Sequence, residues 1–457
     1  MPTRGRRDDG GASASDRKKV ADKHGKQLAA KASDALIQSL ARARPRMAAV
    51  EALGTAGTAS AIIELTPVPR PAGPAAGEDL AAAQPQAREA ARWAAMNRLR
   101  DECQRHASDV RSLLEKRASS KAAVEGLMPG AMRGTVQLAW LIGALRTPLD
   151  PRVLSTVAET AQVDRIDLPR RLQADIDGTG ALLGAPALLA LAGAATVDVV
   201  VAVIDSEVDI DHPALRGHAV RAENYTLEAW GNPARHGTAV AGIIASTDPR
   251  FRGMAPGARI RNYKVLATRE DLTGDDFSGA LALQRALEDG VRVANCSWGA
   301  GPATDGKSRE ARACDAAWDL GMAIVKSAGN QGPGANTMTT PADARGVIVV
   351  AATSRDGKRI PDYSSRGPAA NGRRPDLAAP GGEATVPIHS CLVGGGLGDC
   401  GAGTSFAAPH VSGLLASMLQ HQALLTPDEL KTALLRSCQP LGHTSADAQG
   451  TGLFRFS

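Results

Sequence analysis

An acid, a base, an amide and a hydroxyl stand in four separate segments of the sequence. Asp205 ends an apolar run, His236 precedes a stretch of small residues, and Asn330 follows a second apolar run. Ser405 lies between a glycine-rich turn and an alanine-rich apolar segment. A serine hydroxyl becomes a good nucleophile when a neighbouring base takes its proton and an acid orients that base. The four residue types therefore predict attack on a carbonyl carbon, with the amide as a donor to the oxyanion.

Each of these side chains is expected where a strand ends or a helix begins. The β-branched run before Asp205 is typical of a buried parallel strand, and catalytic groups of open α/β sheets gather at the carboxyl ends of such strands. Ser405 is expected at a helix N-terminus, where backbone N–H groups favour developing negative charge. A serine there is by itself more often an N-cap, but the other three segments favour catalysis.

Further motifs occur in the same order, and with them the chain resembles the subtilisin-like serine proteases, the subtilase family. The order Asp, His, Ser is the subtilisin order. The resemblance covers roughly residues 180–457. It rests on Gly184-Ala185-Pro186, Asp211-His212-Pro213-Ala214-Leu215, Gly253-Met254-Ala255-Pro256, Asn295-Cys296-Ser297-Trp298-Gly299, Tyr363-Ser364-Ser365-Arg366-Gly367 and Ala379-Pro380-Gly381. It implies a doubly wound α/β fold with a mostly parallel sheet.

The resemblance gives the matched residues their roles. His236 would take the proton of Ser405, and Asp205 would fix the imidazole tautomer. Asn330 would donate to the oxyanion together with the backbone N–H of Ser405. Two sets of residues would bind substrate, one as an edge on which an extended peptide pairs and one as the wall of the primary specificity pocket. They are Ser297, Trp298 and Gly299 for the edge, and Ser327, Ala328 and Gly329 for the wall.

Two other histidines and two departures from the family pattern bear on this assignment. His212 and His410 are expected to be structural, because the base must reach the nucleophile and the acid together. Glu207 stands where the family usually has glycine, which places a negative charge near the acid and could disfavour acidic substrates. Ala239 stands where the family often has a second histidine. That histidine is not the base, so the alanine is not expected to affect catalysis.

Residues 58–177 are predicted to form a small α+β domain ahead of a protease domain at 178–457. Strands are expected at 60–66, 136–142 and 163–168, and helices at 86–117 and 151–160. The order strand, helix, strand, helix, strand resembles the inhibitory propeptide of subtilases, and the segment 168–172 would then run through the active site. An unrelated regulatory domain is the alternative.

Residues 1–57 are predicted to be a basic, disordered arm. The first 50 residues carry 12 Lys and Arg against 5 Asp and Glu, whereas the whole chain has a net charge of only +5. The basic excess therefore belongs to the arm and not to the catalytic domain. Nucleic-acid binding is less favoured than a solvated extension, because the arm lacks interleaved aromatic residues.

The sequence predicts a cytoplasmic protein, unless the true start lies upstream, because no hydrophobic segment follows the early arginines. The uncharged stretch 180–197 contains Pro186 and leads into the catalytic strand, which argues against a membrane span. Cys391 and Cys400 could form a disulfide if the protein is exported, but the odd cysteine count of the protease part favours thiols. The chemistry requires no cofactor. Members of the family often bind calcium, so the resemblance makes a structural calcium ion possible, but no carboxylate cluster in the sequence indicates a site.

The sequence is compatible with two functions of different classes. The leading one is a serine endopeptidase that acts on polypeptides and is made as a self-inhibited precursor, with its own N-terminal domain as the inhibitor. Among endopeptidases, the absence of a signal peptide in this sequence favours a maturation protease that cleaves one partner protein in the same cell. A secreted enzyme that degrades many proteins is less favoured. The alternative is a catalytically silent, protease-like regulatory or binding module. Inactive relatives usually lose a triad residue, whereas Asp205, His236 and Ser405 are all present, so the sequence favours the enzyme.

Overall fold

The computed structural model describes residues 60–68, 85–118, 136–148, 157–167, 171–174 and 198–454, apart from 257, 269–271 and 443, with single residues at 17, 18, 20, 30–32 and 154. The chain divides into two compact units. The smaller comprises Met1–Pro71 and Asn97–Pro169, and the larger comprises Ala72–Met96 and Arg170–Ser457. No helix among the described residues is both long and apolar enough to cross a bilayer.

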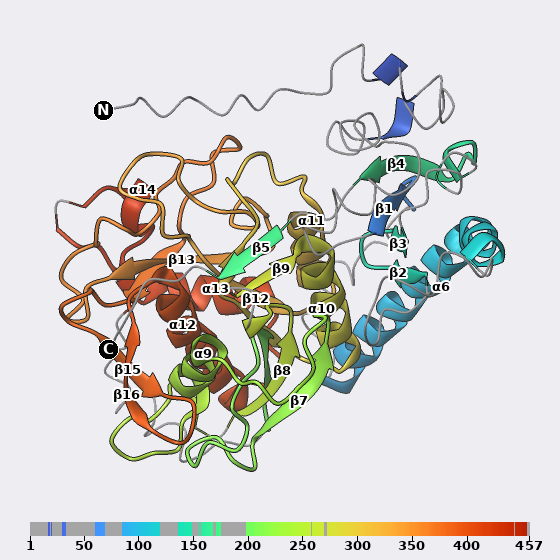
Figure 1. Ribbon diagram of the computed structural model, residues 1–457. Coiled ribbons are helices and arrows are strands. Elements are labelled where there is room, and N and C mark those ends of the chain that lie inside the picture. The colour runs from blue at the N-terminus through green and yellow to red at the C-terminus, as the bar shows by residue number, and fades with distance from the viewer. Residues whose placement is uncertain are drawn as a thin grey trace. The chain divides into compact units, whose positions relative to one another are not determined.

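A nine-stranded sheet forms the centre of the larger unit (Figure 1). Its neighbouring strands run parallel except for the pair β17 and β18 at one edge. Strands β10, β12, β13 and β14 are buried along their whole length because helices cover both faces. In spatial order the strands are β17 (Cys438–Gln439), β18 (Leu453–Phe454), β14 (Leu377–Pro380), β13 (Ile348–Thr353), β12 (Ala323–Ser327), β10 (Val293–Cys296), β6 (Val200–Asp205), β8 (Arg259–Lys264) and β7 (Ala219–Asn224).

Four helices show that the sheet is doubly wound, as the sequence predicts. Helices α9 (Arg235–Ala245) and α12 (Thr404–His421) pack on each other, and α12 also packs on β10, β12, β13 and β14. Helices α10 (Asp276–Glu288) and α11 (Arg309–Asp319) pack on each other and against β6, β8 and β12. The chain moves from one side of β6 to the other between β8 and β10, which makes the carboxyl end of β6 a topological switch point.

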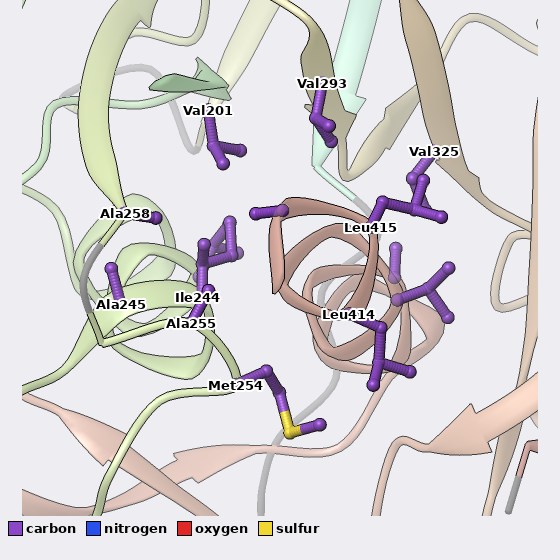
Figure 2. Close-up of a cluster of buried hydrophobic side chains, with 14 of the residues drawn as sticks. Val201, Ile244, Ala245, Met254, Ala255, Ala258, Val293, Val325, Leu414 and Leu415 are labelled. Carbon is purple, nitrogen blue, oxygen red and sulfur yellow. The ribbon is translucent and has the colours of Figure 1, made fainter. Parts of the chain in front are cut away.

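The core between the sheet and the helices α9 and α12 is built from small and branched side chains. Figure 2 shows Leu414 and Leu415 of α12 and Ile244 of α9 below strand residues that include Val201 and Val293. Val201, Val203, Val293 and Val325 belong to this cluster, whereas their immediate strand neighbours point to the other face. The alanine-rich sequence of α12 therefore lets the helix approach the sheet closely.

The smaller unit holds an antiparallel sheet in the order β2-β3-β1-β4. Residues of helix α6 (Pro85–Ala118) from Asn97 onward belong to this unit, and Val110 and Leu114 pack against Ile63 and Leu145. The four strands are β1 (Ser60–Leu65), β2 (Gln137–Ala139), β3 (Ala144–Pro148) and β4 (Val163–Asp167).

Most of the elements expected within residues 58–177 are present, but one strand prediction is wrong. The sequence predicts a single strand over 136–142, whereas β2 ends at Ala139 and the chain turns back into β3. Gly143 supplies the turn with a φ of 61°, which favours glycine. Trp140, Leu141 and Ile142 are all buried in this turn, so the period-2 pattern does not continue. Of the helix expected at 151–160, only Leu154, Val157 and Ala158 are described as helical.

Candidate active site

Asp205 and His236 meet at the carboxyl end of β6. The Nδ1 atom of His236 lies 2.7 Å from Oδ1 of Asp205, and both side chains are buried. The same oxygen accepts hydrogen bonds from the backbone N–H and the hydroxyl of Ser206, at 2.7 and 3.0 Å. Gly237 lies so close to Ser206 that a Cβ atom there would come within 2.5 Å of its carbonyl oxygen. The start of α9 is therefore held tightly against the end of the strand.

Ser405 is the second residue of α12, and it lies beside the segment that follows β10. Its Oγ donates to the carbonyl oxygen of Ser297 at 3.3 Å, and Ser297 Oγ donates to the carbonyl oxygen of Ser405 at 2.9 Å. The ring of the next residue, Phe406, lies 5.7 Å from the imidazole of His236, centroid to centroid. The first turns of α9 and α12 thus bring His236 and Ser405 to one region.

Asn330 lies three residues after the end of β12, next to the start of α12. Its Oδ1 accepts from the backbone N–H and the hydroxyl of Thr404, at 3.0 and 2.9 Å. Because Oδ1 accepts both bonds, the Nδ2 end of the amide points away from Thr404. The amide Nδ2 is buried and has no hydrogen-bond partner among the described residues. A buried donor beside the residue that precedes Ser405 is suited to an oxygen that acquires negative charge.

The segment Ser297–Gly299 carries an added strand. Strand β11 (Trp298–Gly299) pairs antiparallel with β5 (Arg171–Ala174), so that Trp298 lies opposite Ala174 and Gly299 opposite Gln173. On its other side β5 pairs antiparallel with β9 (Thr273–Asp275). A peptide from the same chain therefore lies between two strand edges, in the arrangement by which extended peptides are commonly bound. The Trp298 indole donates to the carbonyl oxygen of Ile204 at 2.8 Å, which ties this edge to β6.

Ser327, Ala328 and Gly329 follow one another at the carboxyl end of β12, and all three are buried. The backbone N–H of Gly329 donates to the hydroxyl of Thr404 at 3.1 Å. Gly329 has a φ of 112°, and a Cβ atom there would come within 2.8 Å of Ser365 Oγ. The predicted pocket wall and the start of α12 are thus joined through Thr404.

His212 and His410 have the backbone contacts expected of structural histidines. His212 Nε2 lies 2.7 Å from the carbonyl oxygen of Gly396, and His212 Nδ1 accepts from the backbone N–H of Ala214. His410 Nδ1 lies 2.8 Å from the carbonyl oxygen of Phe406, one turn earlier in α12. Burial lowers the pKa of His410 to about 4, which keeps the ring neutral at pH 7.

Glu207 is buried and belongs to an ionic network at the ends of β6 and β8. Its carboxylate lies 3.2 Å from Nζ of Lys264 and 2.9 Å from Arg221, and it accepts from the backbone N–H groups of 231 and 232. Lys264 also contacts Glu228 at 2.9 Å. Burial alone would raise the pKa of Glu228, but hydrogen bonds from Lys264 and Asn232 outweigh it and bring that pKa to about 2. The network secures the loop that leads into α9.

Cys391 and Cys400, which the sequence could pair in a disulfide, lie in β15 (Ile388–Cys391) and β16 (Leu397–Gly401). Cys391 and Cys400 are free thiols, and burial raises the pKa of each to about 12. Among the described residues, no group of three or more His, Cys, Asp or Glu side chains could hold a metal ion. Calcium binding, which the family resemblance makes possible, stays an expectation from the sequence.

Sequence reasoning did not single out several residues that shape the site. Ser206 connects Asp205 to the start of α9, and Thr404 connects Asn330 to the start of α12. Each of them is the sequence neighbour of a predicted catalytic residue, and this adjacency is the feature of the sequence that could have indicated a role at the site. Lys326 and Thr339 meet next to Ser327 of the predicted pocket wall, although they are 13 residues apart. Only the tertiary structure brings these two together.

Comparison with known proteins matches the larger unit to one family. A family model described as the subtilase family matches residues 196–452. Subtilisin E of Bacillus subtilis (strain 168) is 34% identical over 255 residues, which are 54% of this chain and 62% of that protein. Serine protease AprX of the same strain is 30% identical over 267 residues, which are 52% of this chain and 60% of that protein.

A shorter relative is matched over most of its length. Subtilisin of Bacillus pumilus is 34% identical over 264 residues, which are 56% of this chain and 88% of that protein. Among solved structures, a mutant of the protease domain of PatA matches with 26% identity and a TM-score of 0.49, over 57% of this chain and 94% of that one. The chain spans less than two thirds of Subtilisin E and of AprX.

Proposed function

The chain belongs to the subtilase family, and from this premise we propose that it is a serine endopeptidase that hydrolyses peptide bonds through an acyl-enzyme. The observation that carries the proposal is the buried 2.7 Å contact between His236 and Asp205, at a point where His236 also meets the residue after Ser405. An imidazole oriented in this way can act as a general base toward a hydroxyl beside it. Polypeptides are the substrate class.

In the proposed first step, Ser405 Oγ attacks the carbonyl carbon of the scissile bond while His236 Nε2 takes its proton. Asp205, which already contacts Nδ1, stabilises the imidazolium that forms. The carbonyl oxygen becomes an oxyanion, to which Asn330 Nδ2 and the backbone N–H of Ser405 donate. His236 then returns the proton to the leaving amine, and water releases the acyl group by the same sequence of proton transfers.

We also propose that the N-terminal region, residues 58–177, inhibits the protease until it is cleaved away. The pairing of β5 with β11 and β9 supports this, because residues 171–174 occupy the edge on which a substrate would pair. The strand belongs to that region and lies near its C-terminal end, so it acts as a tethered competitor at high effective concentration. Cytoplasmic residence stays a prediction from the sequence.

The same pairing favours a second candidate, a catalytically silent module whose substrate edge is permanently covered. A serine-directed fluorophosphonate probe separates the two, because it bonds only to an activated serine. The full-length protein is incubated to allow cleavage and then labelled, with Ser405→Ala as the matched control. Labelling in the parent and none in Ser405→Ala, together with loss of peptide hydrolysis, supports the enzyme. An unlabelled parent at every stage of incubation supports the silent module.

A further inference from the structure

Arg92 is a buried arginine in the first half of helix α6, in the part of the helix that belongs to the larger unit. Only 8% of the residue is exposed. Its Nε donates to the carbonyl oxygen of Leu320 at 2.5 Å, and its Nη2 donates to that of Val291 at 3.2 Å. One side chain of the N-terminal region therefore binds to two separate segments of the protease domain.

The two acceptors lie where helices α10 and α11 end. Leu320 is the C-cap of α11, and Val291 lies two residues after the C-cap of α10. In each helix the residue after the C-cap is a glycine in the left-handed region, Gly290 with a φ of 77° and Gly321 with a φ of 90°. The C-terminal end of a helix carries partial negative charge, which favours a cation beside it. The guanidinium thus connects two helix ends that both attract it.

The two glycines let α6 approach these helix ends closely. A Cβ atom added to Gly321 would come within 3.2 Å of Arg92 Cδ, and one added to Gly290 within 3.8 Å of Trp93 Cζ2. Met96, one turn after Arg92 on the same face of α6, is buried as well. The contact between α6 and the helix ends therefore combines hydrogen bonds with close packing.

Charges around the contact are complementary. Burial, together with the nearby charge of Arg292, lowers the pKa of Arg92 to about 10, so the guanidinium is still protonated at pH 7. The negative charge of Glu89, one turn earlier in α6, acts in the opposite direction on the pKa of both arginines. Arg292 of the protease domain is itself held at this place, because its Nε donates to the carbonyl oxygen of Gly321 at 3.2 Å. Helix α6 therefore contributes both a cation and an anion that are favourable here.

This contact and the substrate edge lie at opposite ends of β10. Val291 and Leu320 precede the parallel strands β10 and β12, whereas the edge Trp298–Gly299 follows β10 at its carboxyl end. Strand β5, which pairs with that edge, comes from the same N-terminal region as α6. Residues 58–177 therefore contact the protease domain at two places that are separated by the length of a strand.

We propose that the ends of α10 and α11 form a docking surface for α6, held by Arg92, which keeps the N-terminal fragment bound after the chain is cut between β5 and β6. The inference rests on the proposed function for the cut and for the inhibition by β5. The partner is the chain's own N-terminal fragment. Two linked contacts bind more tightly than either contact alone. The fragment would therefore still inhibit at concentrations at which β5 by itself would dissociate.

A foreign site-specific protease can cut the chain without using its own activity. Its recognition sequence is inserted between residues 169 and 170 of the full-length Ser405→Ala protein, so that β5 stays on the protease fragment and no longer contributes to binding. Sedimentation over a dilution series then gives the Kd between the fragments. We expect the parent fragments to stay associated after the cut. Arg92→Met should raise the Kd at least about tenfold, because two hydrogen bonds from a charged donor are lost.

Arg105→Met is the matched control. Arg105 is exposed on the same helix and donates within α6, to the carbonyl oxygen of Asp101, so its replacement should leave the Kd as in the parent. Trp93→Ala removes the ring beside Gly290 and should also raise the Kd. Parent fragments that separate as soon as the chain is cut, or equal Kd values in Arg92→Met and Arg105→Met, would overturn the inference. If Arg92→Met does not fold, the parent and Trp93→Ala decide.

Docking and catalysis can fail separately in these experiments. The Ser405→Ala protein lacks the proposed nucleophile, so the Kd values do not depend on the endopeptidase function. Fragments that separate at once, in a protein whose active form labels with the fluorophosphonate probe, overturn the docking surface alone. An active form that never labels overturns the endopeptidase, whereas a tenfold effect of Arg92→Met still supports the docking surface.

Discussion

A single oxygen of Asp205 receives the hydrogen bonds that orient the proposed base. Its Oδ1 accepts from His236 Nδ1 and from the N–H and hydroxyl of Ser206, whereas Oδ2 is buried without a hydrogen-bond partner among the described residues. The carboxylate is thereby held in one rotamer by the start of the loop that follows β6. Such fixed geometry lowers the reorganisation needed when His236 becomes charged.

Replacement of Asn330 should slow the chemical step and change substrate binding much less. The buried Nδ2 is aimed at charge that exists only in the transition state, whereas Oδ1 is used by Thr404. We expect Asn330→Leu to lower kcat by about 10²–10³, the range known for loss of such a donor in subtilisin itself, with KM nearly unchanged. Steady-state kinetics on one peptide measure both. A variant that raises only KM would place Asn330 in substrate binding.

At the scale of elements, helix α12 carries both Ser405 and a neutral buried histidine. His410 lies one turn after Phe406, and its pKa of about 4 follows from burial. Because the unfolded chain would protonate this ring near pH 6.5, the unfolded state binds more protons between pH 6.5 and 4. Folding stability from this group is therefore complete above about pH 6.5 and is lost as the pH falls to 4.

The predicted loss between pH 6.5 and 4 is about 3 kcal/mol for His410 alone. Urea unfolding followed by tryptophan fluorescence measures it, in a Ser405→Ala background that prevents self-digestion. His410→Gln should reduce the difference between the two pH values by this amount, whatever it does to stability at pH 7. An unchanged pH dependence in His410→Gln would mean that another group titrates.

The loop before α9 is secured by a buried ion network rather than by apolar packing. Glu207, where the family usually has glycine, contacts Lys264 and Arg221 and accepts two backbone N–H groups of the loop. Removing one partner from a buried pair costs about 3–5 kcal/mol, because the other charge stays buried. Lys264 retains Glu228, so the cost for Glu207 should lie at the lower end of that range.

Glu207→Gln is therefore expected to lower the free energy of unfolding by about 3 kcal/mol at pH 7. Urea midpoints in the Ser405→Ala background give the value. Asp319→Asn is the matched control, because it breaks an exposed pair with Arg345 and should cost less than about 1 kcal/mol. Equal effects in the two variants would show that the network contributes no more than a surface pair.

At the scale of the whole molecule, the proposed inhibition depends on chain connectivity. Strand β5 ends at residue 174 and β6 begins at residue 200 of the same unit, so a cut between them would leave the blocking strand on a separate fragment. Cleavage converts a tethered competitor into one that dissociates, and its affinity then depends on concentration. Degradation of the fragment would release the activity.

Separate expression of the two regions tests this inhibition. Residues 178–457 are produced alone and together with residues 1–177, and hydrolysis and yield are measured. We expect the N-terminal piece to inhibit in trans, in proportion to its concentration, and to improve the yield of active protease. If the lone domain folds normally and the added piece does neither, residues 58–177 are a partner-binding or targeting element instead.

Local patterns in the sequence predict the elements that position the site. The β-branched run before Asp205, the small residues after His236 and the alanine-rich stretch after Ser405 become β6, α9 and α12 because burial and backbone geometry act over a few residues. Helix α6 runs from Pro85 to Ala118, against an expectation of 86–117. The sequence predicts one strand over 136–142 instead of a hairpin at Gly143, because the buried turn residues are as apolar as those of a strand.

The sequence by itself determined the family, the fold class and the order of the proposed catalytic residues, because each rests on a short motif. Only the tertiary structure decided what lies against the site. The pairing of β5 with Trp298 and the contact of Lys326 with Thr339 join residues that are well separated in the chain. No local periodicity encodes such contacts, because they arise when the sheet brings distant strand ends to one edge.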